Sequence, residues 1–485
     1  MLLKPRTKHE VPDVSDICGL GAIELSAMIK QRQLSSREVV SAFLDRIETV
    51  NPVVNAIVSP RPREDILREA DSADAAIRGG RGGGPMFGLP IAIKDLARTK
   101  GIATTYGSRA LADLVPEDDE LFVERIRAAG AIIIGKTNVP EFGFGSQTYN
   151  NVFGATANAF DPKLTAGGSS GGAAAAVSLN LVPIADGSDM GGSLRNPAAY
   201  NNIYGFRPSQ GLVPSGQKPE VFLSPMSTDG PMARNVADLA MLLDVMAGYD
   251  FRAPLSYNGV PNHLTGLTAH LLSARIGWLG DLGGHLPFEN GILELCEAAL
   301  RRLEELSFRI EPMVPAFDFE QLWRAFVTLR QSTGGCGLLA LYDNPATRDL
   351  LKPEAVWEIE ASLSLTAREI YAASVVRTSW YYLLQDLFER YDFLALPTAQ
   401  VFPFDIELHW PDEVNGRRMD SYHRWMEVVI GATMAGCPVV NVPVGFDGHG
   451  RPMGMQLIGK PRADLDTLRL GAAYERSYPW TAGVS

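Results

Sequence analysis

Short, wholly apolar runs alternate with segments of helical pattern along most of this 485-residue chain. Apolar runs of this kind are typical of strands that are covered on both faces. Such strands separated by helices predict an α/β fold: a single large domain with a central mixed, mostly parallel twisted sheet covered by helices on both faces. The predicted strands are Leu89–Ile93, Ala131–Ile134, Leu181–Ala185, Arg275–Trp278, Phe393–Leu396, Val439–Val444 and Met453–Ile458. The predicted helices are Glu24–Lys30, Ser36–Thr49 (with Ser35 and Glu38 in capping-box spacing), Glu64–Ile77, Glu120–Ala129, Gly172–Leu179, Glu289–Leu306, His423–Ala435 and Leu465–Arg476.

Composition and charge exclude several classes of protein. With 46% hydrophobic and 21% charged residues the chain has a globular composition. A net charge of −12 without any Lys/Arg-rich run argues against nucleic acid or an anionic membrane as a partner. No apolar run approaches about 18 residues, and the N-terminal segment lacks the apolar region of a signal peptide. We therefore expect a cytoplasmic protein with no membrane span, a monomer or a homodimer, forming one domain over residues 1–485.

The cysteines give no indication of a metal site or a disulfide framework. Cys18, Cys296, Cys336 and Cys437 are scattered, without CxxC spacing. Such cysteines are expected to be reduced thiols in the core. The sequence also has no clustered His, Cys and carboxylate ligand set, so we expect neither a metal ion nor another cofactor.

Two serines in glycine-packed turns carry the chemistry that the sequence predicts. Ser169 lies in GGSSGG and Ser193 in GSDMGGSLR, and Lys94 follows the apolar run in GLPIAIKD upstream. Glycine beside a serine lets the backbone turn sharply and lets a substrate carbonyl approach the N–H groups. Two such serines with one lysine and no nearby histidine indicate acyl transfer with lysine as the base.

Two other motif matches compete with this interpretation. GAIIIGKT at residues 130–137 fits the phosphate-loop pattern, but its centre is strand material and Pro140 stands where the helix should run. GGSSGG also contains the G-x-S-x-G pattern of an α/β-hydrolase nucleophile elbow. That elbow would need a downstream histidine, and His409, His423 and His449 occupy unremarkable contexts. We expect a strand at residues 131–134 and no elbow.

The motifs, taken together, resemble those of the amidase signature family of serine hydrolases. The resemblance spans about residues 20–478, which we take as the domain core. The matching passages, in chain order, are GLPIAIKD (88–95), GKTNVPEFGFGS (135–146), GGSSGGAAAA (167–176), GSDMGGSLRNPAA (187–199), GFRPSQGLVP (205–214), DGPMARNVADLA (229–240) and GRPMGMQLIGK (450–460).

The resemblance implies a role for each residue of the predicted site. Lys94 corresponds to the catalytic base, Ser169 to the bridging serine that follows a cis peptide bond, and Ser193 to the nucleophile. The oxyanion hole corresponds to the backbone N–H groups of Met190, Gly191, Gly192 and Ser193.

These roles make physical demands on the fold. Serine becomes a good nucleophile only when a base removes its proton, and a lysine can do so only when neutral. An ordinary lysine with a pKa of about 10.4 is almost entirely protonated near neutral pH, so Lys94 must be buried without a carboxylate partner. Asp95 is adjacent, but consecutive strand residues point to opposite faces. We expect Asp189 to hold the serine loop through backbone N–H groups and Arg195 to brace it.

The substrate is less constrained than the reaction. In the family, the segment corresponding to Gly143, Phe144 and Gly145 runs beside the scissile group, so we expect these residues to bind substrate. Aromatic side chains concentrated between residues 310 and 430 would form either an apolar substrate pocket or a helical core. They are Trp323, Phe326, Trp380, Tyr381, Tyr382, Trp410, Tyr422 and Trp425.

We therefore expect an amidase that acts on a small, uncharged aryl or aliphatic amide through an acyl-enzyme intermediate. Esters, anilides and carbamates are further candidates, because this route accepts different leaving groups. Two alternatives stay open: an A-type subunit of an amidotransferase that needs a partner chain, and a catalytically silent binding protein. MSTDGPMAR (226–234) stands where the transamidating subunit has an Asp-Gln pattern, which favours free-standing hydrolysis.

Overall fold

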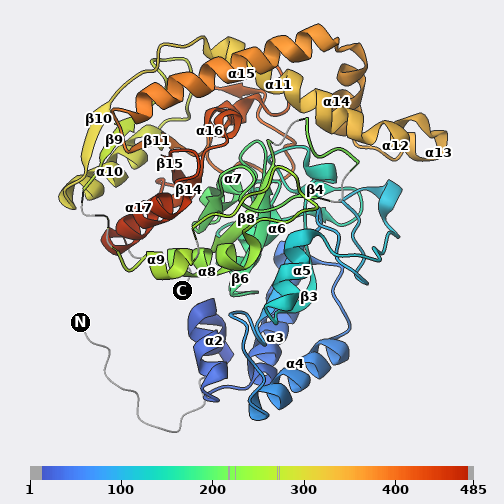
Figure 1. Cartoon of the computed structure of the whole chain (residues 1–485). Coiled ribbons are helices and arrows are strands. Elements are labelled where there is room, and N and C mark those ends of the chain that lie inside the picture. The colour runs from blue at the N-terminus through green and yellow to red at the C-terminus, as the bar shows by residue number, and fades with distance from the viewer. Residues whose placement is uncertain are drawn as a thin grey trace.

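A mixed eight-stranded sheet organises the computed structural model, which describes residues 14–478 apart from 217–218, 224–225, 261, 270 and 272 (Figure 1). Its strands in spatial order are β10 (Arg309–Pro312), β9 (Arg275–Trp278), β11 (Phe393–Pro397), β15 (Pro452–Gly459), β14 (Val439–Phe446), β7 (Tyr204–Arg207), β8 (Thr228–Ala233) and β6 (Ile184–Asp189). A second sheet has the order β1 (Ile57–Val58), β3 (Ile132–Thr137) and β2 (Pro90–Lys94). Two short ribbons pair β4 (Tyr149–Asn150) with β5 (Gly154–Ala155), and β12 (Glu413–Val414) with β13 (Arg417–Arg418).

Helices surround the sheets. They are α1 (Val14–Gly19), α2 (Ala22–Lys30), α3 (Ser36–Val54), α4 (Arg63–Arg78), α5 (Leu121–Ala128), α6 (Gly171–Ser178), α7 (Arg195–Tyr200), α8 (Val236–Met246), α9 (His263–Gly266), α10 (Ile292–Glu305), α11 (Phe319–Arg330), α12 (Leu339–Asp343), α13 (Pro345–Arg348), α14 (Pro353–Ser364), α15 (Ala367–Phe388), α16 (Ile430–Ala435) and α17 (Asp464–Ser477). Figure 1 shows α11, α14 and α15 at one end of the molecule and α2, α3 and α4 at the other. Among the described residues, no helix is both long and apolar enough to cross a bilayer.

The large sheet is covered on both faces, as the apolar strands predict. Consecutive residues of β14 point to opposite sides. Val440 lies against Gly471 of α17, where a Cβ on the glycine would come within 3.2 Å of its side chain. Asn441 faces the other side and donates from Nδ2 to the carbonyl of Ile203, just beyond α7, at 3.1 Å. The α/β architecture with a mixed sheet is therefore confirmed.

The strand pairing differs from the mostly parallel sheet that we expected. The pairs β10–β9 and β9–β11 are parallel, but the chain of pairs from β11 through β15, β14, β7 and β8 to β6 is antiparallel. A tight turn joins β14 to β15 as a hairpin, which forces antiparallel pairing there. The short strands β7 and β8, absent from the predicted set, supply the other antiparallel partners.

Many predicted elements have bounds that differ from those of the structure, and the helix expected at Ser36–Thr49 continues to Val54. The strand expected at Leu181–Ala185 begins at Ile184 and continues to Asp189, because the polar half of β6 pairs with β8 as far as Thr228. The helix expected at His423–Ala435 is instead a 3₁₀ segment, Arg424–Val429, followed by α16. Non-helical backbone angles at Met426 interrupt the 3₁₀ segment itself. Helices α8, α11, α14 and α15 were not among those predicted.

Other local predictions are confirmed. Ser35 caps α3 in a reciprocal capping box with Glu38. GAIIIGKT contains the buried strand β3, so its lysine does not begin a helix. Cys18, Cys296 and Cys437 are buried free thiols as expected, whereas Cys336 is exposed.

Candidate active site

Lys94 is the last residue of β2, and its side chain is buried with 1% of its surface exposed. Its Nζ lies 2.8 Å from the Oγ of Ser169 and 2.7 Å from that of Ser170, both just ahead of α6. It also lies 2.9 Å from the Oγ of Ser188 in β6. The amine is therefore surrounded by hydroxyl groups, which can bond to it in either protonation state.

Burial sets the protonation of this lysine. Loss of solvent lowers the pKa of Lys94 to about 7, although the carboxylates of Asp186, Asp229 and Asp189 each act to raise it. Asp186 accepts the backbone N–H of Lys94 at 3.0 Å, and burial raises the pKa of this carboxyl to about 7. Since the nearby carboxyl is itself costly to ionise here, a substantial fraction of Lys94 is neutral near pH 7.

Two positions near Ser169 require glycine, because neighbouring residues pack closely against the backbone there. The Gly168–Ser169 peptide bond is cis, as the family resemblance implies. Gly167 has a φ of +72°, and a Cβ there would lie 2.4 Å from the Oδ1 of Asn196. A Cβ on Gly172 would lie 2.3 Å from the backbone nitrogen of Asn138. Larger residues at either position would displace the turn that carries Ser169.

Asp189 and Arg195 hold the loop that carries Ser193. The carboxylate of Asp189 accepts the N–H of Gly192 at 3.0 Å and that of Leu194 at 3.1 Å. It also pairs with Arg195 at 2.9 Å, and both side chains are fully buried. Burial acts to raise the pKa of Asp189, but the Arg195 guanidinium outweighs it and holds this pKa well below its ordinary range. The bracing roles predicted for both residues are confirmed.

This loop changes one part of the expected oxyanion hole. The Gly192 N–H already donates to Asp189, so it is not available to a substrate oxygen. Within the part of the chain that the structure describes, the N–H groups of Met190, Gly191 and Ser193 have no such partner. The expectation for Gly192 is therefore corrected, and three of the four predicted donors remain.

A pocket at Ser193 is also lined by Gly143, the glycine that packs against Ser169. Gly143, Gly145, Gly191 and Ser193 lie on its wall. A Cβ on Gly143 would be 3.4 Å from the Oγ of Ser169, so the bridging hydroxyl lies directly behind this glycine. The structure thus brings Lys94 and Ser169 into direct contact and places Ser193 on the same pocket. The other residues that line the pocket are Ser146, Trp323, Phe326, Arg330, His423, Met426 and Ile430.

Phe144 does not line this pocket, although we expected it to bind substrate beside its two glycine neighbours. Its ring lies 5.1 Å from the guanidinium of Arg330 and packs in a cluster with Ala355 and Tyr422. Gly143 and Gly145 both have positive φ angles, so the chain turns at each of them, and the glycines line the pocket while the phenylalanine packs behind it.

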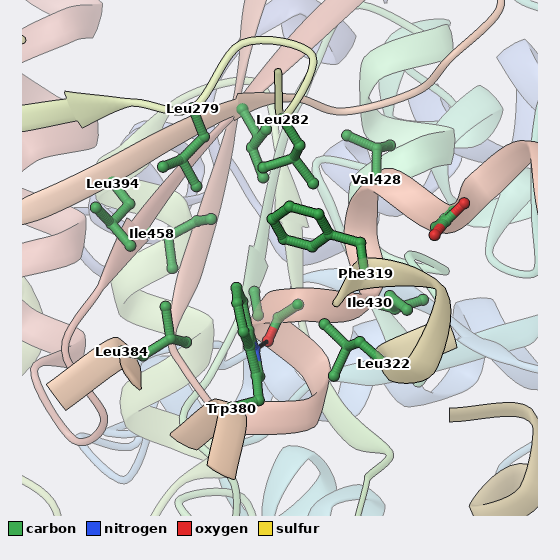
Figure 2. Close-up of a pocket in the computed structure, with 14 residues that line it drawn as sticks. Leu279, Leu282, Phe319, Leu322, Trp380, Leu384, Leu394, Val428, Ile430 and Ile458 are labelled. Carbon is green, nitrogen blue, oxygen red and sulfur yellow. Dashed lines mark hydrogen bonds between the residues drawn. The ribbon is translucent and has the colours of Figure 1, made fainter. Parts of the chain in front are cut away.

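The aromatic residues between 310 and 430 divide among several environments. Trp323 and Phe326 line the pocket at Ser193. Trp380 lines a separate apolar cavity on the other side of α11 and α16, where it faces Phe319 and Leu384 (Figure 2). Trp425 is buried in the core, and the two tyrosines that follow Trp380 are exposed. Trp410 and Tyr422 border a surface groove. Some of these aromatics therefore line a pocket, and others pack in the core or lie at the surface.

Several residues of the site were not identified from the sequence. Ser170 and Ser188 contact Lys94, and no motif distinguishes their hydroxyls from structural ones. Arg330 and His423 reach the pocket from segments more than a hundred residues away from Ser193 along the chain. Arg330 donates from Nε to Glu358 at 2.6 Å and from Nη2 to the Tyr422 hydroxyl at 2.9 Å. Their chemistry depends on this long-range packing, which leaves no local signal.

Asp95 and Lys136 form a second buried polar centre behind β2 and β3. Asp95 accepts from the hydroxyl of Thr105 at 2.6 Å, on the opposite face of β2 from the Lys94 side chain. Lys136 Nζ donates to Ala97 O at 2.5 Å and to Thr99 Oγ1 at 2.7 Å. Burial lowers the pKa of Lys136 to about 8, partly offset by Asp95. As expected, Asp95 is not the partner of Lys94.

Over the described residues, no group of three or more His, Cys, Asp or Glu side chains could hold a metal ion.

Comparison with known proteins identifies the family. The Amidase family profile matches residues 38–468. The acylamidase of Rhodococcus erythropolis is 32% identical over 466 residues, which cover 95% of this chain and 96% of that protein. The A-type subunit of the glutamyl-tRNA(Gln) amidotransferase of Thermus thermophilus is 34% identical over 486 residues, covering 94% and 97%. The crystal structure of a bacterial aryl acylamidase of the amidase signature family superposes with a TM-score of 0.90 at 31% identity, covering 95% of this chain and 96% of that one. The chain therefore belongs to the amidase signature family of enzymes.

Proposed function

We propose that this protein is a free-standing amide hydrolase that works through an acyl-enzyme on Ser193. Lys94 is the base, and Ser169 relays the proton between the two. The observation that carries the proposal is the buried amine of Lys94, 2.8 Å from the Ser169 hydroxyl and with a pKa near neutrality. A buried lysine of this kind is suited to general-base catalysis at physiological pH.

The proposed reaction begins with proton transfer. Neutral Lys94 takes the hydroxyl proton of Ser169 as Ser169 takes that of Ser193. The Ser193 oxygen then bonds to the amide carbon, and the carbonyl electron pair moves onto oxygen. The free N–H groups of Met190, Gly191 and Ser193 are the candidate donors to this oxyanion, each typically worth about 10²–10³ in rate.

The acyl-enzyme forms when the C–N bond breaks. The departing nitrogen takes a proton back from Lys94 through Ser169 and leaves as the free amine. A water molecule then attacks the ester on Ser193, with Lys94 again accepting the proton through Ser169. When the bond between the acyl carbon and the Ser193 oxygen breaks, Lys94 returns the proton to Ser193 through Ser169, which releases the carboxylic acid and restores the starting enzyme, so that one water is consumed for each amide cleaved.

The pocket supports a small, uncharged aryl or aliphatic amide as substrate. Trp323 and Phe326 supply apolar aromatic surface beside Ser193. The one guanidinium that reaches the pocket in the described residues, Arg330, is already paired with Glu358, so it is not free to bind a substrate carboxylate. The similarity to an acylamidase and to an aryl acylamidase supports the same class. Anilides, esters and carbamates fit the same mechanism.

An amidotransferase A-type subunit is the second candidate. The amidotransferase subunit of Thermus thermophilus is as similar to this chain as the acylamidase is. Such a subunit would need a partner chain, and a catalytically silent binding protein would need no chemistry at all. The Lys94–Ser169 contact and the N–H groups beside Ser193 count against a silent binding protein, and the passage MSTDGPMAR (226–234) favours hydrolysis without a partner chain. We further propose a cytoplasmic monomer or homodimer, in one domain, that requires no cofactor.

A hydrolysis panel combined with active-site labelling tests the proposal. Purified protein should hydrolyse at least one class among anilides, primary amides, esters and carbamates without ATP or a partner chain. Peptide mapping after treatment with a fluorophosphonate probe should find the label on Ser193 in the wild type and should find none at that position in Ser193→Ala. An adduct on Ser169 or Ser170 would indicate the nucleophile elbow instead. Activity only with ATP and a partner chain would indicate the amidotransferase, and no activity or labelling would indicate a binding protein.

A further inference from the structure

His423 lies on the pocket at Ser193 with both of its ring nitrogens unpaired. The side chain is 7% exposed and lines the pocket. Among the residues that the structure describes, neither Nδ1 nor Nε2 has a hydrogen-bond partner. A buried polar atom without a partner costs free energy, and most such atoms in native proteins are bonded. Two such atoms on one ring, in a side chain that lines the pocket, indicate a partner that arrives with the substrate.

Other buried polar atoms of the described residues also lack a partner, among them Glu358 Oε2, Ser421 Oγ and His263 Nε2, but none of these residues lines the pocket at Ser193, which sets His423 apart. His285 Nε2 lies 2.7 Å from Glu427, and Arg424 donates to the same carboxylate at 2.8 Å. Glu427 is the charged group on the apolar cavity of Figure 2, so that neighbouring cavity contains no comparable unpaired side chain. His263 is paired through its Nδ1 with Asp244 at 2.7 Å.

Packing holds the ring of His423 in place. It stacks on Tyr422 with ring centroids 4.4 Å apart and lies 5.0 Å from the ring of Trp323. Phe326 and Trp357 pack on it at 6.3 and 5.7 Å. A rigid ring can bond only to a group that reaches its edge, so it discriminates by position as well as by polarity.

The ring is also uncharged. Burial holds the pKa of His423 well below its ordinary value, and the positive charges of Arg330 and Arg424 lower it further. A neutral imidazole has one N–H donor and one nitrogen acceptor. A hydroxyl or an amide can bond to either nitrogen, whereas a carboxylate could bond only to the donor and an ammonium only to the acceptor.

We propose that His423 determines specificity by bonding to a neutral hydroxyl or amide substituent on the acyl or amine part of the substrate. The inference rests on the proposed function, because it places the scissile amide at Ser193. It refines the substrate class from an uncharged amide to one that also carries a neutral hydrogen-bonding group.

Matched substrates that differ by one hydroxyl test this role. Lactanilide and isobutyranilide differ by hydroxyl against methyl on the acyl side, and hydroxyacetanilides and methylacetanilides differ in the same way at the ortho, meta and para positions of the amine side. The measured quantity is kcat/KM for each pair, in the wild type and in His423→Phe. The ratio between the two proteins cancels the intrinsic reactivity of each substrate.

For at least one pair, the hydroxyl preference of the wild type should exceed that of His423→Phe by about tenfold or more. His423→Gln, which keeps a donor and an acceptor, should retain part of that preference. If the phenylalanine variant does not fold, the comparison of His423→Gln with His423→Met serves in its place.

Equal preferences in wild type and variant, within about twofold for every pair, would overturn the inference. A second measurement is thermal unfolding without substrate. His423→Phe should melt no lower than the wild type, because no bond of the ring nitrogens is lost. A clear drop in Tm in a folded variant would show that the nitrogens are already bonded in the free protein, and would also overturn it. Wild-type hydrolysis of these pairs without a hydroxyl preference leaves the proposed function standing, whereas no hydrolysis by the wild type of any amide counts against the function itself.

Discussion

Amide hydrolysis by this protein should be about tenfold slower at pH 6 than at pH 8, because the base must be neutral and the pKa of Lys94 is about 7. About one lysine in eleven is neutral one pH unit below its pKa, and about ten in eleven are neutral one unit above it. A lysine with the ordinary pKa of about 10.4 would give a different profile, with the rate still rising about tenfold for each pH unit beyond pH 9.

Burial accounts for the size of the shift in the pKa of Lys94. The difference between a pKa of about 10.4 and one of about 7 corresponds to about 5 kcal/mol. The unfolded chain keeps this proton up to about pH 10 whereas the folded protein releases it near pH 7, so the unfolded state binds more protons in between. The free energy of unfolding of the wild type should therefore rise with pH relative to that of Lys94→Met. The difference should grow by about 2 kcal/mol between pH 7 and pH 9, measured by urea denaturation.

The activity assay is kcat/KM for a chromogenic anilide from about pH 5 to about pH 9, in the wild type and two variants. Lys94→Met should lose about three orders of magnitude or more and should lack the rise through pH 7. Lys136→Met removes another buried lysine, on the neighbouring strand β3 and outside the pocket, so it should keep that rise. The reasoning would be refuted if Lys94→Met kept more than about a tenth of the activity, or if the wild-type rise lay above pH 9.

Three further outcomes follow from the same geometry. Arg195→Ala should lower the free energy of unfolding by about 3–5 kcal/mol, since it leaves the buried carboxylate of Asp189 unpaired; an unchanged denaturation midpoint would argue against this. Gly143→Val should lower kcat/KM by about tenfold or more, because a Cβ at this φ of +76° would lie 2.9 Å from Leu96 and 3.4 Å from the hydroxyl of Ser169; wild-type kinetics in the folded variant would contradict it. Dialysis against EDTA should leave the rate unchanged, because the proposed base, nucleophile and donors are all protein groups, and a loss that added metal restores would disprove this.

The sequence was sufficient to predict those helices and strands that depend on interactions between residues close together in the chain. The Ser35–Glu38 capping box marks the start of α3 within the sequence itself, and the short runs predicted as strands at residues 275–278, 393–396 and 439–444 form β9, β11 and β14. The pairing of strands was not predictable in the same way. β7 and β8 contain glycine, proline and charged residues, and they are strands because neighbouring strands supply their hydrogen bonds.

The candidate site was likewise predictable from the sequence only in part. Glycine-flanked Ser169 and Ser193, with Lys94 at a strand end, were identifiable from the sequence because each motif is a short run with its own backbone requirement. The sequence did not show that the Gly192 N–H donates to Asp189, nor that His423 lines the pocket.

The sequence by itself determined which residues could supply a base, a nucleophile and a flexible backbone around them. Only the tertiary structure decided the state of those groups. The pKa of Lys94 depends on the exclusion of water by β2, β6 and the turn before α6, and on the three aspartates around it. Burial and electrostatic environment are sums over groups distant in the chain, so no local pattern contains them.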